Sequence, residues 1–436
     1  MKQITDFSDS ICIIGGGASG LMAACTALES GVKTVVFEKN RSSKFYESEK
    51  FFDNAYLGKK LLITGKGRCN ITNNCSKDGF FANVPRNPKF LFAAYNSFTS
   101  EDTINFFENI GLKLKTERGN RVFPVSDKSL DVLNSLKNYL KSLGCTFINE
   151  EVSDINYENF EVSSIVTSSG KIYPCRNIII CTGGKSYPVT GSSGDGYRFA
   201  QKAGHTIISP VPSLVPLVSD DDFCKRLQGL SLKNVKLSLI CKKNKKCVFE
   251  ETGELLFTHF GLSGPLILSA SAHIGAVPSD YYVKIDLKPA LCEKKLSDRL
   301  LLDFEKNKNK EFKNALSGLL PSKLIPVFVQ KTEIPPELQI NAVTKQQRQK
   351  IIETLKEFSV NISGFRPIDE AVITRGGIKT SEINPSTMQS KLVQGLYFAG
   401  EVIDVDGYTG GFNLQIAFST AHLAAKSCAK KILTEV

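Results

Sequence analysis

A cluster of glycines directly after a short apolar run is the first feature of this sequence that could do chemistry. Gly15, Gly17 and Gly20 follow the run Ile11–Ile14 with the spacing G-x-G-x-x-G. Glycines at these places let backbone N–H groups approach a pyrophosphate closely. Glu38 closes a second apolar run about twenty residues further on, where a carboxylate can accept from ribose hydroxyls. Strand, glycines, helix, strand and acid in this order predict dinucleotide binding, and the acid disfavours a 2′-phosphate in the pocket.

Two later glycine clusters repeat this arrangement. Residues 182–184 (Thr-Gly-Gly) end a buried run, and Asp195 follows shortly at the start of a predicted helix. Near the end of the chain, Glu401 follows the apolar run 396–399, and Gly410 and Gly411 open a final helix. A helix start offers unpaired N–H groups and a positive dipole end, which could hold the negative charge of a reduced flavin.

Composition is that of an ordinary globular protein. The chain has 436 residues, 42% of them hydrophobic, a net charge of +11 and twelve cysteines. No apolar run reaches the roughly 20 residues of a membrane span, and we expect a cytoplasmic protein with reduced thiols. The lysines concentrate at 242–246 and 294–313, where acids are interleaved in the second segment, so a surface role is favoured over nucleic-acid binding.

The order of predicted elements indicates an α/β fold with insertions. Buried runs and glycines occur at both ends, short alternating strands follow about Pro210, and a Lys- and Leu-rich helical stretch comes next. We expect a linker at Pro210, Pro212 and Pro216. The predicted domains are a nucleotide-binding domain at 1–209 and 369–436, an inserted β-rich domain at 210–293 and 355–368, and a helical domain at 294–354.

Six segments of the sequence resemble the motifs of one protein family. They are "IIGGGASGLMAA", "GKKLLITGKGRCNITNN", "FPVSDKS", "CTGGKSYPVTGSSGDGY", "GELLFTHFGLSGPLIL" and "GLYFAGEVIDVDGYTGGFNLQIAFSTA". The chain resembles the BaiN-type and aminoacetone oxidase-like NAD(P)/FAD-dependent oxidoreductases, and "TGSSGDGYRFAQKAG" is similar to fumarate reductase flavoproteins near the flavin ring. The resemblance implies a Rossmann-like FAD domain built from both chain ends, an inserted antiparallel barrel-like domain and a small helical domain.

The resemblance and the spacing together give a set of FAD contacts. The pyrophosphate is assigned to Gly15, Gly17, Ala18, Ser19 and Gly20, the ribose to Glu38, and the adenine to the backbone of Val152. The ring and ribityl chain are assigned to Arg68, Cys69, Asn70, Gly400, Glu401, Gly411, Phe412 and Asn413. Further expected contacts are Lys39, Lys66, Gly67, Thr182, Gly183, Gly184 and Asp195.

The sequence departs from the family pattern at two places beside the expected cofactor. Lys66 stands in "GKGRCN" where the family has a glycine, and the segment 41–57 is longer than expected. Cys69 and Cys75 raise the alternative of a redox dithiol, but disulfide reductases of this type use C-x-x-x-x-C, and this chain has one more residue between the two cysteines. A Cys69 that packs near the ring is the favoured interpretation.

The catalytic residues are harder to predict. The candidate acids or bases are three residues in motif segments, His259, Tyr187 and Tyr408. For each of them the alternative is a purely structural role. The four histidines have no metal-ligand spacing, so no metal site is expected.

The leading function is hydride transfer between bound FAD and a small organic substrate, with NADH or NADPH as a possible reductant. The alternatives are an RNA-binding or tRNA-modifying flavoprotein, and a flavin-responsive binding protein without turnover. The substrate and the oligomeric state are not predicted.

Overall fold

The computed structural model describes residues 6–40 and 57–435. The described chain forms two compact units, which we call the terminal unit (Met1–Pro212 with Ala371–Val436) and the middle unit (Ser213–Glu370). Each unit has its own cluster of buried apolar side chains. Most of the longer segment expected at 41–57 lies outside the described residues.

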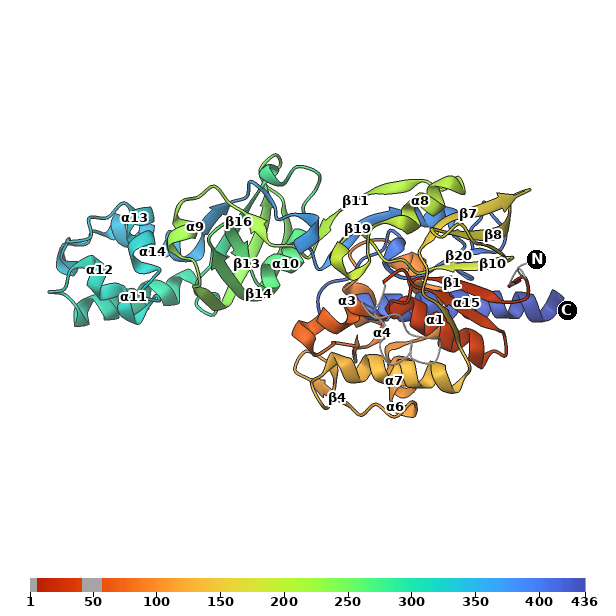
Figure 1. The fold of residues 1–436 in the computed structure, drawn as a ribbon. Helices are drawn as coiled ribbons and strands as arrows, with labels where there is room; N and C mark the ends of the chain where they lie inside the picture. Colours follow the sequence, from red (N-terminus) through yellow and green to blue (C-terminus); the bar gives the residue numbers. More distant parts are fainter. Residues whose placement is uncertain (1–5, 41–56, 436) are drawn as a thin grey trace. The chain divides into compact units, whose positions relative to one another are not determined.

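The terminal unit is built on a five-stranded parallel sheet with the order β20-β10-β1-β2-β6 (Figure 1). Its strands are β1 (Ile11–Ile14), β2 (Thr34–Phe37), β6 (Thr146–Ile148), β10 (Asn177–Ile180) and β20 (Leu396–Phe398). Every residue of β1, β2, β10 and β20 is buried, as expected for parallel strands covered on both faces. The apolar run before the first glycines and the run before Glu38 are therefore confirmed as strands.

Two helices from opposite ends of the chain pack together in this unit. Helix α1 (Ala18–Glu29) contacts α15 (Phe412–Glu435), and Figure 1 shows them beside the parallel sheet. Ala23, Ala24 and Ala27 of α1 are fully buried. Small side chains at these positions allow α1 to approach its neighbours closely, and the first and last segments of the chain thus share one core.

The remaining elements of the terminal unit surround this centre. The helices are α3 (Lys59–Ile63), α4 (Lys77–Ala82), α5 (Phe92–Ser97), α6 (Ser100–Asn109), α7 (Ser129–Ser142) and α8 (Asp195–Lys202). One small sheet has the order β3-β5-β4, with β3 (Thr72–Asn73), β4 (Leu114–Glu117) and β5 (Arg121–Pro124). Another has the order β7-β8-β9, with β7 (Val152–Glu158), β8 (Glu161–Thr167) and β9 (Ile172–Pro174).

The two units divide at Pro212, close to the predicted linker, but the chain at Pro210 and Pro212 is a strand and not an irregular linker. The structure continues β11 (Ile207–Ser213) through both prolines and pairs it with β19 (Ile373–Ile378) in a two-stranded sheet. A proline cannot donate to a strand ladder, but a two-stranded sheet leaves one edge of each strand free, so prolines are tolerated there.

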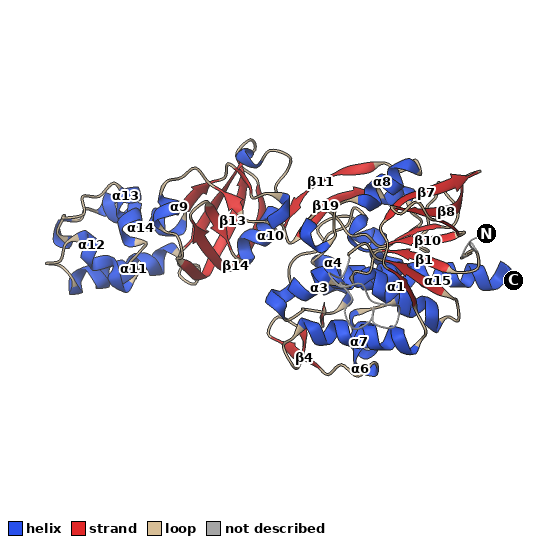
Figure 2. Ribbon diagram, viewed as in Figure 1, coloured by secondary structure: helices blue, strands red, loops and turns tan. Residues whose placement is uncertain are grey.

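The middle unit is a seven-stranded antiparallel sheet with helices (Figure 2). The strand order is β17-β16-β13-β14-β15-β12-β18. Its strands are β12 (Leu217–Val218), β13 (Ser231–Cys241), β14 (Cys247–Thr258), β15 (Gly261–Ser263), β16 (Tyr281–Asp286), β17 (Phe358–Asn361) and β18 (Gly364–Phe365). Its helices are α9 (Phe223–Arg226), α10 (Pro265–Ser271), α11 (Glu293–Lys306), α12 (Phe312–Ala315), α13 (Ile325–Thr332) and α14 (Lys345–Lys356).

The four helices between β16 and β17 share a core with this sheet. Leu296 and Leu300 of α11 belong to the same buried cluster as Leu237 of β13 and Ile285 of β16. The lysine-rich segment 242–246 forms the turn between β13 and β14, as its sequence predicts. Among the described residues, no helix combines the length and apolarity that crossing a membrane would require.

Candidate functional site

Four parallel strands end at one edge of the terminal-unit sheet, and each leads directly into a predicted cofactor segment. Gly15 N–H donates to Phe37 O at 2.8 Å, and Cys181 N–H donates to Ile14 O at 2.8 Å. The chain therefore places the residues after β1, β2, β10 and β20 side by side (Figure 1). The strand order reverses at β1, and the carboxyl edge at such a point is where open α/β sheets bind ligands.

The first glycines have different tasks. A Cβ at Gly20 would come within 1.8 Å of Gly15 O, and one at Gly15 within 2.6 Å of Cys181 O, so packing alone requires both glycines. A Cβ at Gly17 would meet nothing within 4 Å. Gly17 is the N-cap of α1 and provides no side-chain cap, so the space before the first-turn N–H groups fits an anion such as a diphosphate.

Glu38 is fixed beside this loop. Its Oε2 accepts from Gly16 N–H at 2.8 Å, and its Oε1 accepts from the N–H and the side-chain amide of Asn40, both at 2.8 Å. The carboxylate is buried, with 7% of the residue exposed. The predicted ribose-binding acid thus stands at the end of β2 in a defined orientation.

The structure brings Lys39 and Asp195 together. Lys39 Nζ donates to Asp195 Oδ2 at 2.5 Å and also to the Ser193 hydroxyl. Burial alone would raise the pKa of Asp195, but the hydrogen bonds from Lys39 and Ser193 outweigh it and lower that pKa. The segment 193–195, which its resemblance assigns to the neighbourhood of the ring, therefore contacts the residue next to Glu38.

The "GKGRCN" loop has an unusual backbone. Gly65, Lys66, Gly67 and Cys69 all have positive φ, with 59° at Lys66 and 58° at Cys69. A left-handed conformation costs a non-glycine residue roughly 1–3 kcal/mol. Asn70 Oδ1 in the same loop is buried and has no hydrogen-bond partner among the described residues. A ligand donor would satisfy this oxygen, which fits the predicted cofactor contact.

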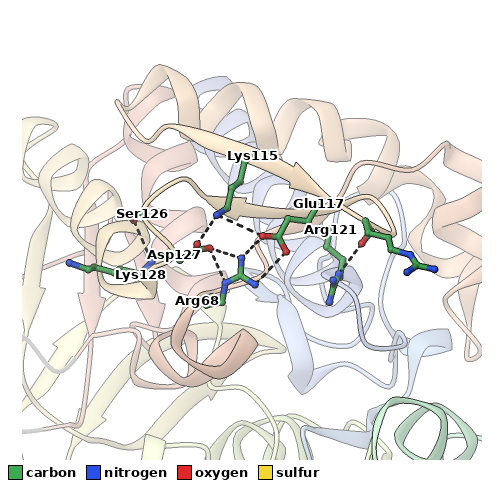
Figure 3. Close-up of polar contacts among 8 residues, drawn as sticks. Arg68, Lys115, Glu117, Arg121, Ser126, Asp127 and Lys128 are labelled. Atoms are coloured by element: carbon green, nitrogen blue, oxygen red, sulfur yellow. Dashed lines mark hydrogen bonds and ion pairs between the residues drawn. The ribbon is translucent and has the colours of Figure 1, made fainter. Parts of the chain in front are cut away.

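Arg68 has most of its donors occupied by the protein itself (Figure 3). Its guanidinium donates to Glu117 Oε1 at 2.5 Å and to Asp127 Oδ1 at 2.8 Å through Nε, and it lies 4.1 Å from the centre of the Phe123 ring. The hydrogen bond with Glu117, followed by that with Asp127, raises the pKa of Arg68. Since two carboxylates neutralise this cation, its side chain holds the loop to β4 and β5.

Cys69 is a poor nucleophile in this structure. Burial raises the pKa of its thiol to about 12, and burial also raises the pKa of Cys75. None of the twelve cysteines, all of which lie in the described residues, forms a disulfide. A thiol that stays protonated at neutral pH does not attack disulfides, so the dithiol alternative is disfavoured.

The start of α15 also presents backbone donors. Gly411 has φ 102°, and a Cβ there would come within 2.4 Å of the Thr72 backbone. The Asn413 side chain accepts from Gly407 N–H at 2.9 Å and donates to Gly407 O at 2.7 Å, which fixes the preceding turn. Phe412 is buried. The first-turn N–H groups of α15 have no partner within their helix, as at any helix start.

The other predicted contacts occupy three places. Thr182 follows β10, and its Oγ1 is a second buried atom without a partner among the described residues. Gly184 lies against Glu401, because a Cβ there would come within 2.7 Å of Glu401 Oε1. Val152 is buried at the start of β7, opposite Thr167.

The candidate catalytic residues lie in different parts of the chain. Tyr187 is half-buried with φ 52°, and Tyr408 is half-buried, with its N–H donating to Asn83 O at 2.9 Å. His259 lies in the middle unit, exposed in the turn between β14 and β15 and edge-on to Phe260. Within residues 6–40 and 57–435, no group of three or more His, Cys, Asp or Glu side chains could hold a metal ion.

Sequence reasoning missed several polar residues of this unit. Lys60, Ser186 and Thr374 all bond Glu401. Asp404 and Asp406 are buried in the motif "EVIDVDGYTGG", and burial raises the pKa of Asp404. Apart from Thr374, these residues lie inside the motif segments, and that was the only signal, because nothing in the local sequence tells which distant side chain will meet them.

The site as a whole fits FAD. It provides an open anion-binding helix start, a fixed acid for ribose hydroxyls, and two buried polar atoms without partners, Asn70 Oδ1 and Thr182 Oγ1. Burying a polar group without a partner is costly, so these atoms indicate where a polar ligand would bind.

Comparisons with known proteins give the family of this chain. A family model described as the HI0933-like protein Rossmann domain matches residues 9–427. A 3-dehydro-bile acid delta(4,6)-reductase from Clostridium scindens is 30% identical over 428 residues, which cover 97% of this chain and 99% of that protein. A ribosomal RNA dihydrouridine synthase from Haemophilus influenzae is 29% identical over 433 residues, which cover 98% of this chain and 100% of that protein. A quinol fumarate reductase structure from E. coli aligns with a TM-score of 0.50 and 15% identity, over 99% of this chain and 72% of that chain, and shows likeness of fold alone.

The fold and the site together define a Rossmann-type, dinucleotide-binding flavoprotein of the α/β class. The chain belongs to the HI0933-like Rossmann family of FAD-dependent oxidoreductases. The predicted resemblance to BaiN-type reductases, the α/β fold class and FAD as cofactor are thereby confirmed.

Proposed function

We propose that this protein reduces a C=C bond conjugated to a carbonyl group, with NADH or NADPH as the reductant and FAD as the bound cofactor. The observation that carries the proposal is the meeting of four strand ends at one edge, each followed by a segment suited to FAD. FAD, when bound, supplies two-electron hydride transfer.

The names of the relatives support this choice of bond. A delta(4,6)-reductase of a 3-dehydro-bile acid saturates C=C bonds in conjugation with a ketone, and a dihydrouridine synthase saturates the uracil C=C bond next to a carbonyl. Both reactions add a hydride and a proton across an electron-poor C=C bond. The two relatives therefore share the type of C=C bond that is reduced, while the rest of the substrate differs greatly between them.

The residues of this chain have three tasks in such a reaction. Gly17 and the first turn of α1 would hold the diphosphate, and Glu38 would accept from the ribose hydroxyls. The N-terminus of α15 would place its positive dipole end toward the ring, which favours negative charge there. A proton must also reach the substrate carbon, and Tyr187, Tyr408 and His259 are the proposed donors.

Anaerobic reduction of the holoprotein tests this function. NADH or NADPH is expected to bleach the flavin absorbance, and a 3-oxo-Δ4 steroid or another enone is expected to restore it. Restoration without oxygen by an enone, with formation of the saturated product, would support the proposal. A flavin that is reduced but transfers no hydride to any conjugated C=C bond would contradict it, and a flavin without any turnover would favour a binding protein.

RNA is the second candidate substrate. The net charge of +11 and the relative named as a ribosomal RNA dihydrouridine synthase favour it. Uridine in RNA would then supply the conjugated C=C bond, and binding would weaken steeply with salt. Dihydrouridine formed in ribosomal RNA on incubation with the reduced protein would establish this substrate, and its absence, together with turnover of a free enone, would exclude it.

A further inference from the structure

A network of hydrogen bonds joins α3, β19 and the segments after β10 and β20 through one carboxylate. Lys60 Nζ donates to Glu401 Oε2 at 2.7 Å and to Ser186 Oγ at 2.6 Å. The Ser186 hydroxyl donates to Glu401 Oε1 at 2.9 Å, and Thr374 N–H donates to the same oxygen at 2.8 Å. Lys60 comes from α3, Ser186 from the segment after β10, and Glu401 from the segment after β20.

Lys60 is held in this place by the glycine loop. Gly58 N–H donates to Gly16 O at 2.9 Å, and a Cβ at Gly16 would come within 2.4 Å of the Leu57 side chain. Gly58 has φ 61° and forms the N-cap of α3. The segment 57–60 is therefore attached to the same loop that begins α1, and Lys60 reaches Glu401 from there.

Glu401 lies close to the expected path of the cofactor. A Cβ at Gly400 would come within 2.7 Å of Ser19 Oγ, at the start of α1, and one at Gly184 within 2.7 Å of Glu401 Oε1. Gly400 thus lies against the first turn of α1, and the Glu401 carboxylate lies against Gly184. The first turn of α1 and Gly184 are both predicted FAD contacts.

The carboxylate has one acceptor position left. An ionised carboxylate offers about four acceptor positions on its two oxygens. Oε1 accepts from Ser186 and Thr374, whereas Oε2 accepts from Lys60 alone. Among the described residues Lys60 is the one donor to Oε2, so its ammonium helps to set the orientation in which a ligand hydroxyl could donate to this oxygen.

The pair is too enclosed to be an ordinary surface ion pair. The side chains of Lys60 and Glu401 are 23% and 20% exposed, and Ser186 is fully buried. Desolvation offsets much of the attraction in such a pair, so its contribution to stability is a weak reason for its presence. Removing only Lys60 leaves an enclosed carboxylate without its counter-charge.

We propose that Lys60 is a positioning residue for FAD: its ammonium orients Glu401 so that Glu401 Oε2 accepts from a hydroxyl of the ribityl chain. This inference rests on the proposed FAD-dependent function. Lys60 acts through Glu401, and its charge balances the carboxylate beside the cofactor. Loss of Lys60 therefore changes both the affinity for FAD and the reduction potential of the bound flavin.

The test compares FAD affinity and flavin midpoint potential in matched variants of the full chain. Lys60→Met is expected to raise the Kd for FAD at least tenfold and to shift the midpoint potential, whereas Lys60→Arg, which keeps the charge, should recover most of the affinity. Lys141→Met, which removes an exposed lysine of α7, is the control and should leave the Kd within twofold. The double variant Lys60→Met/Glu401→Gln should bind FAD better than Lys60→Met alone, because the amide needs no counter-charge.

The outcomes separate this inference from the proposed function. If the unmodified protein binds no FAD, the proposed function fails. If it binds FAD and Lys60→Met matches Lys141→Met in both affinity and potential, only the positioning role is overturned. Should Lys60→Met not fold, Lys60→Arg and the double variant decide, since equal losses in these two variants would also overturn it.

Discussion

The two units of this protein use polar side chains in opposite ways. In the part of the chain that the structure describes, every buried charged residue lies in the terminal unit, including Glu38, Arg375, Asp404 and Asp406. The buried polar side chains of the middle unit are all serine or threonine hydroxyls. Its charged side chains form ion pairs on the surface of the sheet, such as Lys236 with Glu250.

The difference in buried polar side chains between the two units indicates where a ligand binds. A hollow of about 280 Å³ on the middle-unit sheet is lined by residues such as Lys284, Asp286 and Glu357, which are already engaged in ion pairs. The terminal unit instead combines buried charges with several buried polar atoms that have no partner among the described residues, such as Asn70 Oδ1 and Thr182 Oγ1, whereas the middle unit has Thr258 Oγ1. Buried polar groups cost free energy unless they are satisfied, so their concentration indicates a ligand site.

The largest effects are expected from a pair of glycine substitutions that separate packing from ligand binding in the terminal unit. Gly20→Ala is expected to lower the free energy of unfolding by about 4 kcal/mol or more, because its Cβ would come within 1.8 Å of Gly15 O. Gly17→Ala should cost less than about 1 kcal/mol yet raise the Kd for FAD at least tenfold. Denaturant unfolding and FAD titration of both variants check this. A Gly17→Ala variant with normal FAD affinity would refute the assignment of the open space to the diphosphate.

A half-buried histidine gives the terminal unit a pH dependence. Burial lowers the pKa of His422 to about 4 from its ordinary value of 6.5, and its ring stacks on Phe98 between α15 and its neighbours. The unfolded chain therefore binds a proton that the folded chain does not. Stability should be constant above about pH 6.5 and fall by about 3 kcal/mol as the pH drops toward 4.

His422→Gln is the matched variant for this prediction. Burial also lowers the pKa of His205, so part of the acid sensitivity will remain. The difference in unfolding free energy between pH 7 and pH 4.5 should be clearly smaller in the variant. An identical pH dependence in both proteins would show that His422 is not the group responsible.

Substitution of the buried side-chain amide of Gln415 tests the contribution of buried hydrogen bonds to the stability of the terminal unit. Gln415 accepts from Thr72 and Thr103 at 2.6 and 2.8 Å and donates to Phe98 O at 3.0 Å. Gln415→Leu removes all three bonds and leaves the buried Thr72 hydroxyl without its partner, whereas Thr103 and Phe98 O keep bonds to Thr99 O and the Ser419 hydroxyl. The loss should be about 2 kcal/mol. Thr354→Val in the middle unit, whose hydroxyl bonds only Lys350 O within its own helix, should cost less than about 1 kcal/mol. Equal losses in thermal or denaturant unfolding would remove the contrast between the units.

The smallest effect is expected at a surface ion pair of the middle unit. Lys284 and Glu357 lie 2.7 Å apart with side chains 30% and 58% exposed. Lys284→Gln should change the free energy of unfolding by less than about 1 kcal/mol and leave FAD affinity unchanged. A large loss in either measurement would mean that this sheet face has a role beyond packing.

Local patterns were enough to predict part of this structure. The parallel strands, Gly15, Gly20 and Glu38 follow from spacing within a short segment, because the βαβ unit fixes their relation. The end of the chain was also predictable, since buried runs and glycines recur there. These features depend on neighbours close in sequence.

Other features depend on distant partners and could not be predicted. Lys60 and Glu401 are separated by 341 positions, and no periodicity links them. Arg68 looks like a cofactor contact in its motif, but its carboxylate partners come from elsewhere, Glu117 from β4 and Asp127 from the segment after β5. The prolines at 210 and 212 looked like a linker because the sequence does not show that β19, from the other end of the chain, supplies a partner strand.

Direct titration of the full-length protein with FAD tests the central claim most simply. The account predicts saturable binding of one FAD per chain, with flavin absorbance bands on the protein and loss of affinity in Gly17→Ala but not in Lys284→Gln. A folded protein that carries no flavin and binds none on addition would contradict the account.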